Sequence, residues 1–205
     1  MKEMFINKSI LLIKKDYSYD NTMYERIRYG LEIIYLSITK IFVIFLISYL
    51  LRSIKETCIL MIFSTPLRNY SYGIHAKKSW HCYISSIICF VLLPKLLINC
   101  DFSVIIRVTF SIFALVSMVL YAPSDTHKRP IINPKHRKKL KYTSIIITLL
   151  YILLAILIYD NYICNLIYLA LAIQSIAINP ITYKIFKMPY NNYMAYQNVC
   201  NNRNI

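Results

Sequence analysis

Long apolar runs, separated by short polar and basic connections, dominate the pattern of this chain of 205 residues. Several runs approach the ~20 residues that a membrane-spanning helix needs. The pattern therefore predicts an all-α fold, that of a polytopic membrane protein with six transmembrane helices. The six apolar runs cover residues 33–51, 57–63, 83–98, 104–121, 144–159 and 162–178.

The expected organisation is a single membrane domain over residues 1–205. Residues 4–15 mix apolar and basic side chains over a short span, which favours an N-terminal amphipathic helix lying on the inner leaflet. The apolar run at 57–63 is short, but a helix over 54–68 would cross where the bilayer thins locally. The spans are expected at about residues 28–51, 54–68, 79–98, 103–121, 143–159 and 162–179.

Prolines and polar residues are expected to shape the connections. Pro66 should end or bend the second span, and Pro94 should kink the third. Three prolines should break up the basic connection 122–142. Residues 180–205 are expected to form a polar cytoplasmic tail, with its Asn-rich part after Pro189 frayed.

The composition excludes an ordinary soluble domain, since 58% of the residues are hydrophobic and the mean hydropathy is +0.49. Lysine and arginine total 24 against 9 acidic residues, giving a net charge of +15. In a soluble protein this excess would suggest nucleic acid. Here the positive charges lie between apolar runs, so the positive-inside rule accounts for most of them. The bilayer is therefore the expected partner, and nucleic acid is not.

The distribution of positive charge also predicts a topology. The N-terminus, the connection 122–142 and the tail are all basic. If all three are cytoplasmic, four crossings precede the long connection and two follow it, which matches the six apolar runs. The connection between the second and third spans is then cytoplasmic as well.

That connection holds the most informative residues of the chain. It places His75 and Cys82 seven positions apart, and on one unbroken helix the rise would separate them by ~10 Å. A working pair requires a break, which Gly73 allows and which Ser79, a preferred N-cap residue, would end by starting a helix. Cys82 then lies in the first helical turn, where thiolate is stabilised. The arrangement indicates a cysteine nucleophile with a histidine base.

Other readings of this segment stay open. Lys77 and Lys78 strengthen the positive field around the thiol, whereas His81 would point ~100° away from Cys82 on a helix and is the weaker base. Spacing alone also fits an ordinary loop histidine beside an ordinary membrane cysteine. The residues lack the spacing of zinc ligands, so neither a metal nor a cofactor is expected.

Glu32 is the one acidic residue inside the cytoplasmic start of an apolar run. A carboxylate in that place is costly unless it is paired or functional. It would orient His75, as the third member of a catalytic group does, or it would form a salt bridge with Arg68. A snorkelling side chain at a helix end fits equally well.

Two motifs resemble the accessory gene regulator B (AgrB) family of membrane proteins. Arg68, Gly73, His75-Ala76, Cys82 and Ser86 match R-x4-G-x-H-A-x5-C-x3-S. Residues 121–130 resemble the second block, Y-A-P-x-x-T-x-x-x-P, which a basic cluster at 137–141 follows. Residues 29–32, Tyr-Gly-Leu-Glu, resemble the start of the family's first span. The chain departs at Tyr72, where the family commonly has the first glycine of a Gly-Gly pair.

The resemblance implies a cysteine endopeptidase of the bacterial cell membrane. The charge distribution described above predicts that both termini and the active site lie on the cytoplasmic side. The enzyme would mature a quorum-sensing propeptide of the AgrD type. Cys82, aided by His75, would attack near the propeptide's C-terminal side, and an internal thiol or hydroxyl would then close a thiolactone or lactone ring. Residues expected to bind or position this substrate are Arg68, Gly73, Lys77, Lys78, Lys138 and Lys139.

The rival class is a non-enzymatic membrane protein, such as a small transporter or an assembly factor of the inner leaflet. A transporter is expected to show polar residues deep in several spans, whereas beyond Glu32 and Arg107 these spans offer chiefly Ser, Thr, Tyr and Gln174. A lipid-modifying enzyme would usually need an acidic metal-binding cluster, and the sequence shows no such cluster. A homodimer packed through helix faces is compatible with the sequence, although no feature requires one.

Overall fold

The computed structural model describes residues 2–16, 20–74, 79–97, 100, 102–126, 130–158 and 160–194. Its described elements are helical, as predicted, and an isolated parallel β-bridge joins Tyr72 and Ser124. In chain order the elements are α1 (Lys2–Asp16), α2 (Asn21–Leu50), α3 (Ile54–Ser71), α4 (Ser79–Ile87), the π-helix η1 (Ile88–Leu92), α5 (Leu93–Leu97), α6 (Val104–Tyr121), α7 (Pro134–Leu157), α8 (Asn161–Ile178) and α9 (Pro180–Ile185).

The chain divides into two compact units, Met1–Leu50 and Leu51–Ile205. The first unit contains α1 and α2, which pack against each other, with the Phe5 and Tyr35 rings 5.5 Å apart. The glutamate of α1, Glu3, pairs with Arg28 of α2 at 2.9 Å. Helix α1 covers the expected N-terminal helix, and its placement on a membrane surface stays a prediction.

Within the described ranges, five helices are long and apolar enough to cross a membrane. They show the expected exterior of a membrane protein, with large apolar side chains exposed on their outer surfaces. Helix α3 is not among these five helices, because it contains three charged residues, Lys55, Glu56 and Arg68. A sixth crossing therefore stays a prediction. The five candidates are Thr22–Leu50, Trp80–Leu97, Val104–Tyr121, Pro134–Leu157 and Asn161–Ile178.

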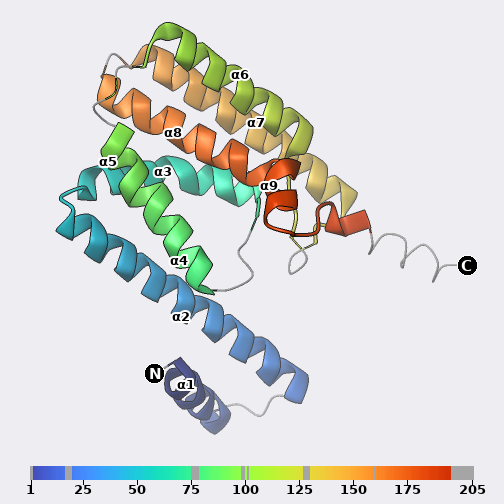
Figure 1. The fold of residues 1–205 in the computed structure, drawn as a ribbon. Coiled ribbons are helices and arrows are strands. Elements are labelled where there is room, and N and C mark those ends of the chain that lie inside the picture. Colours follow the sequence, from blue (N-terminus) through green and yellow to red (C-terminus); the bar gives the residue numbers. More distant parts are fainter. Residues whose placement is uncertain are drawn as a thin grey trace, which may run out of the picture. The chain divides into compact units, whose positions relative to one another are not determined.

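Helix α8 is the central helix of the second unit (Figure 1). It packs against α3, α6 and α7, and two thirds of its length is buried, more than in the other candidate spans. Apolar residues dominate this core, but small hydroxyl side chains share it, including Thr57, Ser117, Thr148 and Ser175. Small residues allow close approach of helices in membranes, and their hydroxyls bond backbone carbonyls.

The basic connection after α6 is shorter than expected, because α7 begins at Pro134. Proline is favoured at the first helical position, and the Asn133 side chain caps the helix by accepting the N–H groups of Lys135 and His136. Most of the basic residues expected in a loop therefore lie on the first two turns of α7. Pro134 starts a helix instead of breaking one.

The other prolines also have defined consequences. Helix α3 continues past Pro66 to Ser71, so of the two expected outcomes Pro66 does not end this helix, and a bend at Pro66 stays a prediction. Around Pro94 the structure has the π-helix Ile88–Leu92. Pro94 has no N–H to donate to the Phe90 carbonyl four residues earlier, and the Thr57 hydroxyl of α3 donates to that carbonyl instead, at 2.9 Å.

Candidate functional site

Cys82 lies in the first turn of α4, which begins at Ser79. This agrees with the prediction that a helix starts at Ser79 and places Cys82 near its N-terminus. The residue is half-buried, and its carbonyl accepts the Ser86 hydroxyl at 2.7 Å. His81 is exposed and its ring stacks on Trp80 at 3.8 Å. The site therefore has a thiol at a helix N-terminus, where anions are stabilised.

The predicted base, His75, lies outside the described residues, as do Lys77 and Lys78. The pairing of His75 with Cys82 therefore stays a prediction. The structure does describe both flanks of this segment, ending at Ile74 on one side and starting again at Ser79 on the other. We call residues 72–78 the site loop, and its described part is Tyr72–Ile74.

Arg68 connects the site loop to Cys82. It lies in the last turn of α3, and its guanidinium Nη2 donates to the Ile74 carbonyl at 2.6 Å. The same guanidinium interacts electrostatically with the Cys82 thiol and the Tyr183 hydroxyl. Arg68 therefore lies within electrostatic range of Cys82, and its hydrogen bond holds the residue immediately before His75.

Gly73 is required by the close approach of the site loop to the end of α8. Its φ of +116° is a conformation that residues with a side chain rarely adopt. A Cβ atom at this position would lie 2.9 Å from the Ala177 carbonyl oxygen. Next to it, the Ile74 N–H donates to that same oxygen at 2.9 Å. These contacts give Gly73 a backbone role, and a role in substrate binding stays a prediction.

Tyr72, where the chain departs from the family motif, also has a positive φ of 59°. Such a conformation is uncommon for a residue with a side chain. The Gln174 side chain of α8 stabilises it, since its Nε2 donates to the Tyr72 carbonyl and to the Ser71 hydroxyl, both at 2.6 Å. A buried amide thus positions the start of the site loop.

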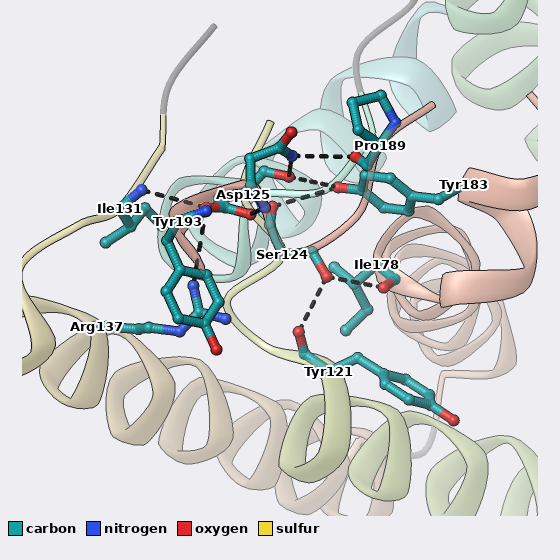
Figure 2. A network of polar contacts seen from close by, with 10 residues as sticks. Tyr121, Ser124, Asp125, Ile131, Arg137, Ile178, Tyr183, Pro189 and Tyr193 are labelled. Atoms are coloured by element: carbon teal, nitrogen blue, oxygen red, sulfur yellow. Dashed lines mark hydrogen bonds and ion pairs between the residues drawn. The ribbon is translucent and has the colours of Figure 1, made fainter. Parts of the chain in front are cut away.

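The loop 122–126, between α6 and α7, provides the main support of the site loop. The Gly73 N–H donates to the Ser124 carbonyl at 2.9 Å, and the Ser124 N–H donates to the Ser71 carbonyl at 3.0 Å. The Ser124 hydroxyl bonds the Ile178 carbonyl at the end of α8, at 2.8 Å (Figure 2). Three segments far apart in sequence therefore meet at Ser124, two through its backbone and the end of α8 through its hydroxyl.

Asp125, the next residue, joins two further segments to this loop (Figure 2). It is 1% exposed, and its carboxylate accepts the N–H groups of Ile131 at 3.4 Å, Asn192 at 3.0 Å and Tyr193 at 2.8 Å. Arg137 of α7 lies 4.0 Å from the carboxylate, and its guanidinium covers the Tyr193 ring at 3.7 Å from the centroid.

Tyr183 of α9 completes the network. Its hydroxyl donates to the Asp125 carbonyl at 3.2 Å and lies 3.4 Å from the Ser124 carbonyl. Burial raises the pKa of Tyr183 above its usual value, so the hydroxyl keeps its proton and remains a donor at neutral pH. The expectation of a frayed segment after Pro189 is therefore wrong for residues 189–194, because Asn192 is buried against Asp125.

Sequence reasoning missed Asp125, Tyr183 and Asn192. One signal was present, since Asp125 is the one acidic residue of the connection 122–142. A lone carboxylate among many basic residues is expected to have a specific set of donors. For Tyr183 and Asn192 the sequence offers no comparable signal.

The remaining predicted residues are placed less closely. Glu32 lies on α2 in the first unit and is half-buried, and the alternatives of orienting His75 and pairing with Arg68 both stay predictions. Lys138 and Lys139 are exposed on the second turn of α7. In the part of the chain that the structure describes, no three His, Cys, Asp or Glu side chains gather to hold a metal ion.

Comparisons with known proteins agree with the motifs. The model of the accessory gene regulator B family matches residues 6–178. An AgrB-like protein of Listeria innocua is 35% identical over 188 residues, 92% of each chain. One from Clostridium acetobutylicum is 34% identical, covering 84% of this chain and 82% of that protein. Accessory gene regulator protein B of Staphylococcus aureus is 35% identical, covering 86% and 93%. No solved structure matches.

Proposed function

Because the chain belongs to the accessory gene regulator B family, we propose that it is a membrane cysteine endopeptidase that cleaves an AgrD-type propeptide. Membership in the family implies a role in processing a quorum-sensing peptide. The observation that carries the finer proposal is the position of Cys82 in the first turn of α4, within electrostatic reach of Arg68. Arg68 in turn holds the carbonyl of Ile74, next to the proposed base.

The first step is attack by the Cys82 thiolate on a peptide carbonyl of the propeptide. His75 takes the thiol proton and then delivers it to the leaving amine, so the acidic C-terminal part departs as a free amine. The product that remains is a thioester between Cys82 and the new C-terminal acyl group. A first-turn position favours this chemistry because helix N–H groups stabilise a thiolate.

The second step is transfer of the acyl group within the substrate. An internal thiol of the propeptide attacks the thioester, the bond to Cys82 breaks, and a thiolactone ring forms while Cys82 recovers its proton through His75. An internal serine would give a lactone by the same route. Transfer competes with hydrolysis, and a site at the membrane edge favours transfer because it keeps water away.

Charge supports recognition of an acidic propeptide tail. Lys138 and Lys139 are exposed on α7, and the site loop adds Lys77 and Lys78. Clustered positive charge raises the local concentration of an anionic ligand. We propose that these lysines attract the tail and that Arg68, whose guanidinium already bonds the site loop, positions a substrate carbonyl.

The proposed topology has six crossings, with α3 as the short second span and with both termini and the site in the cytoplasm. The positive charge at the start of α7 supports this orientation. Labelling of a single cysteine introduced at Lys138 tests it. Reaction with an impermeant maleimide in intact cells would show that position 138 lies outside and that the proposed orientation is reversed. Reaction only after lysis would agree with the proposed orientation.

The test of the function uses the purified protein in lipid vesicles with a candidate propeptide, followed by mass measurement of the products. We expect cleavage and a cyclic product from the natural chain. Cys82→Ala and His75→Ala should both abolish cleavage while leaving insertion intact, and Cys82→Ser should be severely impaired because a hydroxyl is the poorer nucleophile. Cleavage at the natural rate by Cys82→Ala would remove the nucleophile assignment.

A further inference from the structure

We propose that Asp125 is a positioning residue of the peptidase site, acting on the site loop through the backbone of Ser124. The inference rests on the proposed function, since it concerns the loop that carries His75. In this role Asp125 does not contact the substrate. Its effect is to hold the Ser124 peptide, to which the site loop is bonded.

The first support is the number of separate segments that Asp125 joins. Both oxygens of its buried carboxylate accept main-chain N–H groups, one from Ile131 ahead of α7 and two from Asn192 and Tyr193 of the C-terminal segment. A buried main-chain N–H group that loses its acceptor still carries the free-energy cost of its removal from water. The carboxylate therefore fixes these segments to the 122–126 loop.

The second support is the path from Asp125 to the site loop. Ser124, its neighbour in the chain, accepts the Gly73 N–H at 2.9 Å and donates to the Ser71 carbonyl at 3.0 Å. Gly73 lies two residues before His75. A shift of the 122–126 loop therefore moves Gly73, which leads along the chain toward His75, whereas Cys82 lies on a different element, α4.

The third support is the chemistry of the side chain. Among the described residues, the two carboxylate oxygens contact N–H groups and the Arg137 guanidinium. Replacement by asparagine would turn one acceptor oxygen into an NH₂ group that faces an N–H donor. Asp125→Asn thus changes few atoms in size but opposes the hydrogen bonds that hold the loop.

The test compares Asp125→Asn with Asp160→Asn in the purified, vesicle-inserted protein. Asp160 is a matched control, because it is an exposed carboxylate that caps α8 by accepting the Tyr162 N–H at 2.9 Å, and asparagine also caps helices. We expect Asp125→Asn to lower kcat for propeptide cleavage by about tenfold or more with KM within about twofold. Asp160→Asn should stay within about twofold of the natural protein in both. A kcat for Asp125→Asn equal to that of Asp160→Asn would overturn the proposal.

A second readout does not need the substrate. The rate at which iodoacetamide alkylates Cys82, mapped by mass spectrometry across a pH series, reports the coupling of the thiol to its base. We expect the pH profile of Asp125→Asn to move toward that of His75→Ala. A profile unchanged from the natural protein would overturn the positioning role. If the natural protein fails to cleave, the proposed function fails, and this readout still decides the role of Asp125.

Should Asp125→Asn fail to insert, Tyr183→Phe and Asn192→Pro replace it. The first removes the hydroxyl that donates to the Asp125 carbonyl, and the second removes the N–H that donates to its carboxylate. We expect each to lower kcat about threefold or more without a matching rise in KM. Values of kcat within experimental error of the natural protein for both variants would overturn the proposal.

Discussion

The two ends of the second unit are held together in different ways. Helices α3, α6 and α8 run in the same direction, so their last residues meet at the site end and their first residues meet at the opposite end. At the site end, main chain bonds main chain, as between Gly73 and Ser124 and between Ile74 and Ala177. Side chains such as Arg68 and Gln174 add to these main-chain bonds. At the opposite end, single side chains bridge the segments, as when the Asn165 amide donates to the Cys100 carbonyl at 2.7 Å.

The difference indicates where position matters. Main-chain bonds fix the path of a loop directly, whereas a long side chain bridging two segments leaves them more freedom to move. Arg107, for example, reaches both the Phe102 carbonyl and the Asn161 side chain at the opposite end. We therefore expect changes at the site end to reduce catalysis out of proportion to their effect on stability, and changes at the opposite end to do the reverse.

The largest effect is expected from Gly73→Ala. The added Cβ would lie 2.9 Å from the Ala177 oxygen, in a backbone conformation unfavourable for alanine, so the site loop must shift. A displacement near 1 Å can cost about a hundredfold in rate, and we expect a kcat loss of that order. Gly30→Ala is the control, since nothing lies within 4 Å of its added Cβ. Near-normal cleavage by Gly73→Ala would break the comparison.

A smaller effect is expected from Gln174→Leu. The change keeps an apolar contact with the core but removes the donor that bonds the Ser71 hydroxyl and the Tyr72 carbonyl. Buried side-chain hydrogen bonds between membrane helices contribute about 0.6–1.7 kcal/mol. We expect cleavage to fall about fivefold with a stability loss in that range. Both are measurable on one sample, by product formation and by thermal unfolding in detergent.

Asn165→Leu makes the same kind of change at the opposite end. It removes one amide donor to the Cys100 carbonyl, while the Asn165 Oδ1 atom, buried and without a hydrogen-bond partner, is lost without penalty. We expect a stability loss of about 0.6 kcal/mol with cleavage within about twofold of the natural protein. A fall in cleavage equal to that of Gln174→Leu would show that the two ends do not differ.

The smallest effect concerns pH and the site end alone. Burial raises the pKa of Tyr183 above its usual 10.0, so the folded protein keeps a proton that the unfolded chain releases. Stability from this group is complete below about pH 10 and is lost as the pH rises further. Tyr183→Phe should flatten the fall in unfolding temperature above about pH 10. Tyr142→Phe, at an exposed residue, should leave the slope unchanged.

Much of the fold could be predicted from the sequence because membrane-spanning helices are visible as long apolar runs. The start of α4 followed from Ser79 after a flexible glycine. The N-terminal extension of α7 could not be predicted as easily, because its run of basic residues is typical of a loop. The helix start becomes visible only when Asn133 is recognised as the N-cap and Pro134 as the first helical residue. Helix α3 combines a short apolar run with three charges, so its crossing is the least defined by composition.

The candidate site was predictable only in part. The thiol, the arginine and the glycine could be singled out because reactive or positively charged groups and glycines are rare inside apolar segments. Their supports could not, since Ser124 acts mainly through its backbone and Asn192 contacts Asp125 from 67 positions away. Contacts between main-chain atoms of distant segments leave no mark in residue type.

The bond between Thr57 and the Phe90 carbonyl has a consequence for the nucleophile itself. It joins α3 to the π-helix that follows α4, eight residues along the chain from Cys82. Any rotation of this span about its long axis would sweep the thiol sideways and, at the same time, pull the Phe90 oxygen off its hydroxyl donor. Pro94 thus leaves the Phe90 carbonyl without a donor in its own helix, and the bond from Thr57 of α3 to this carbonyl limits the rotation that would displace the Cys82 sulfur.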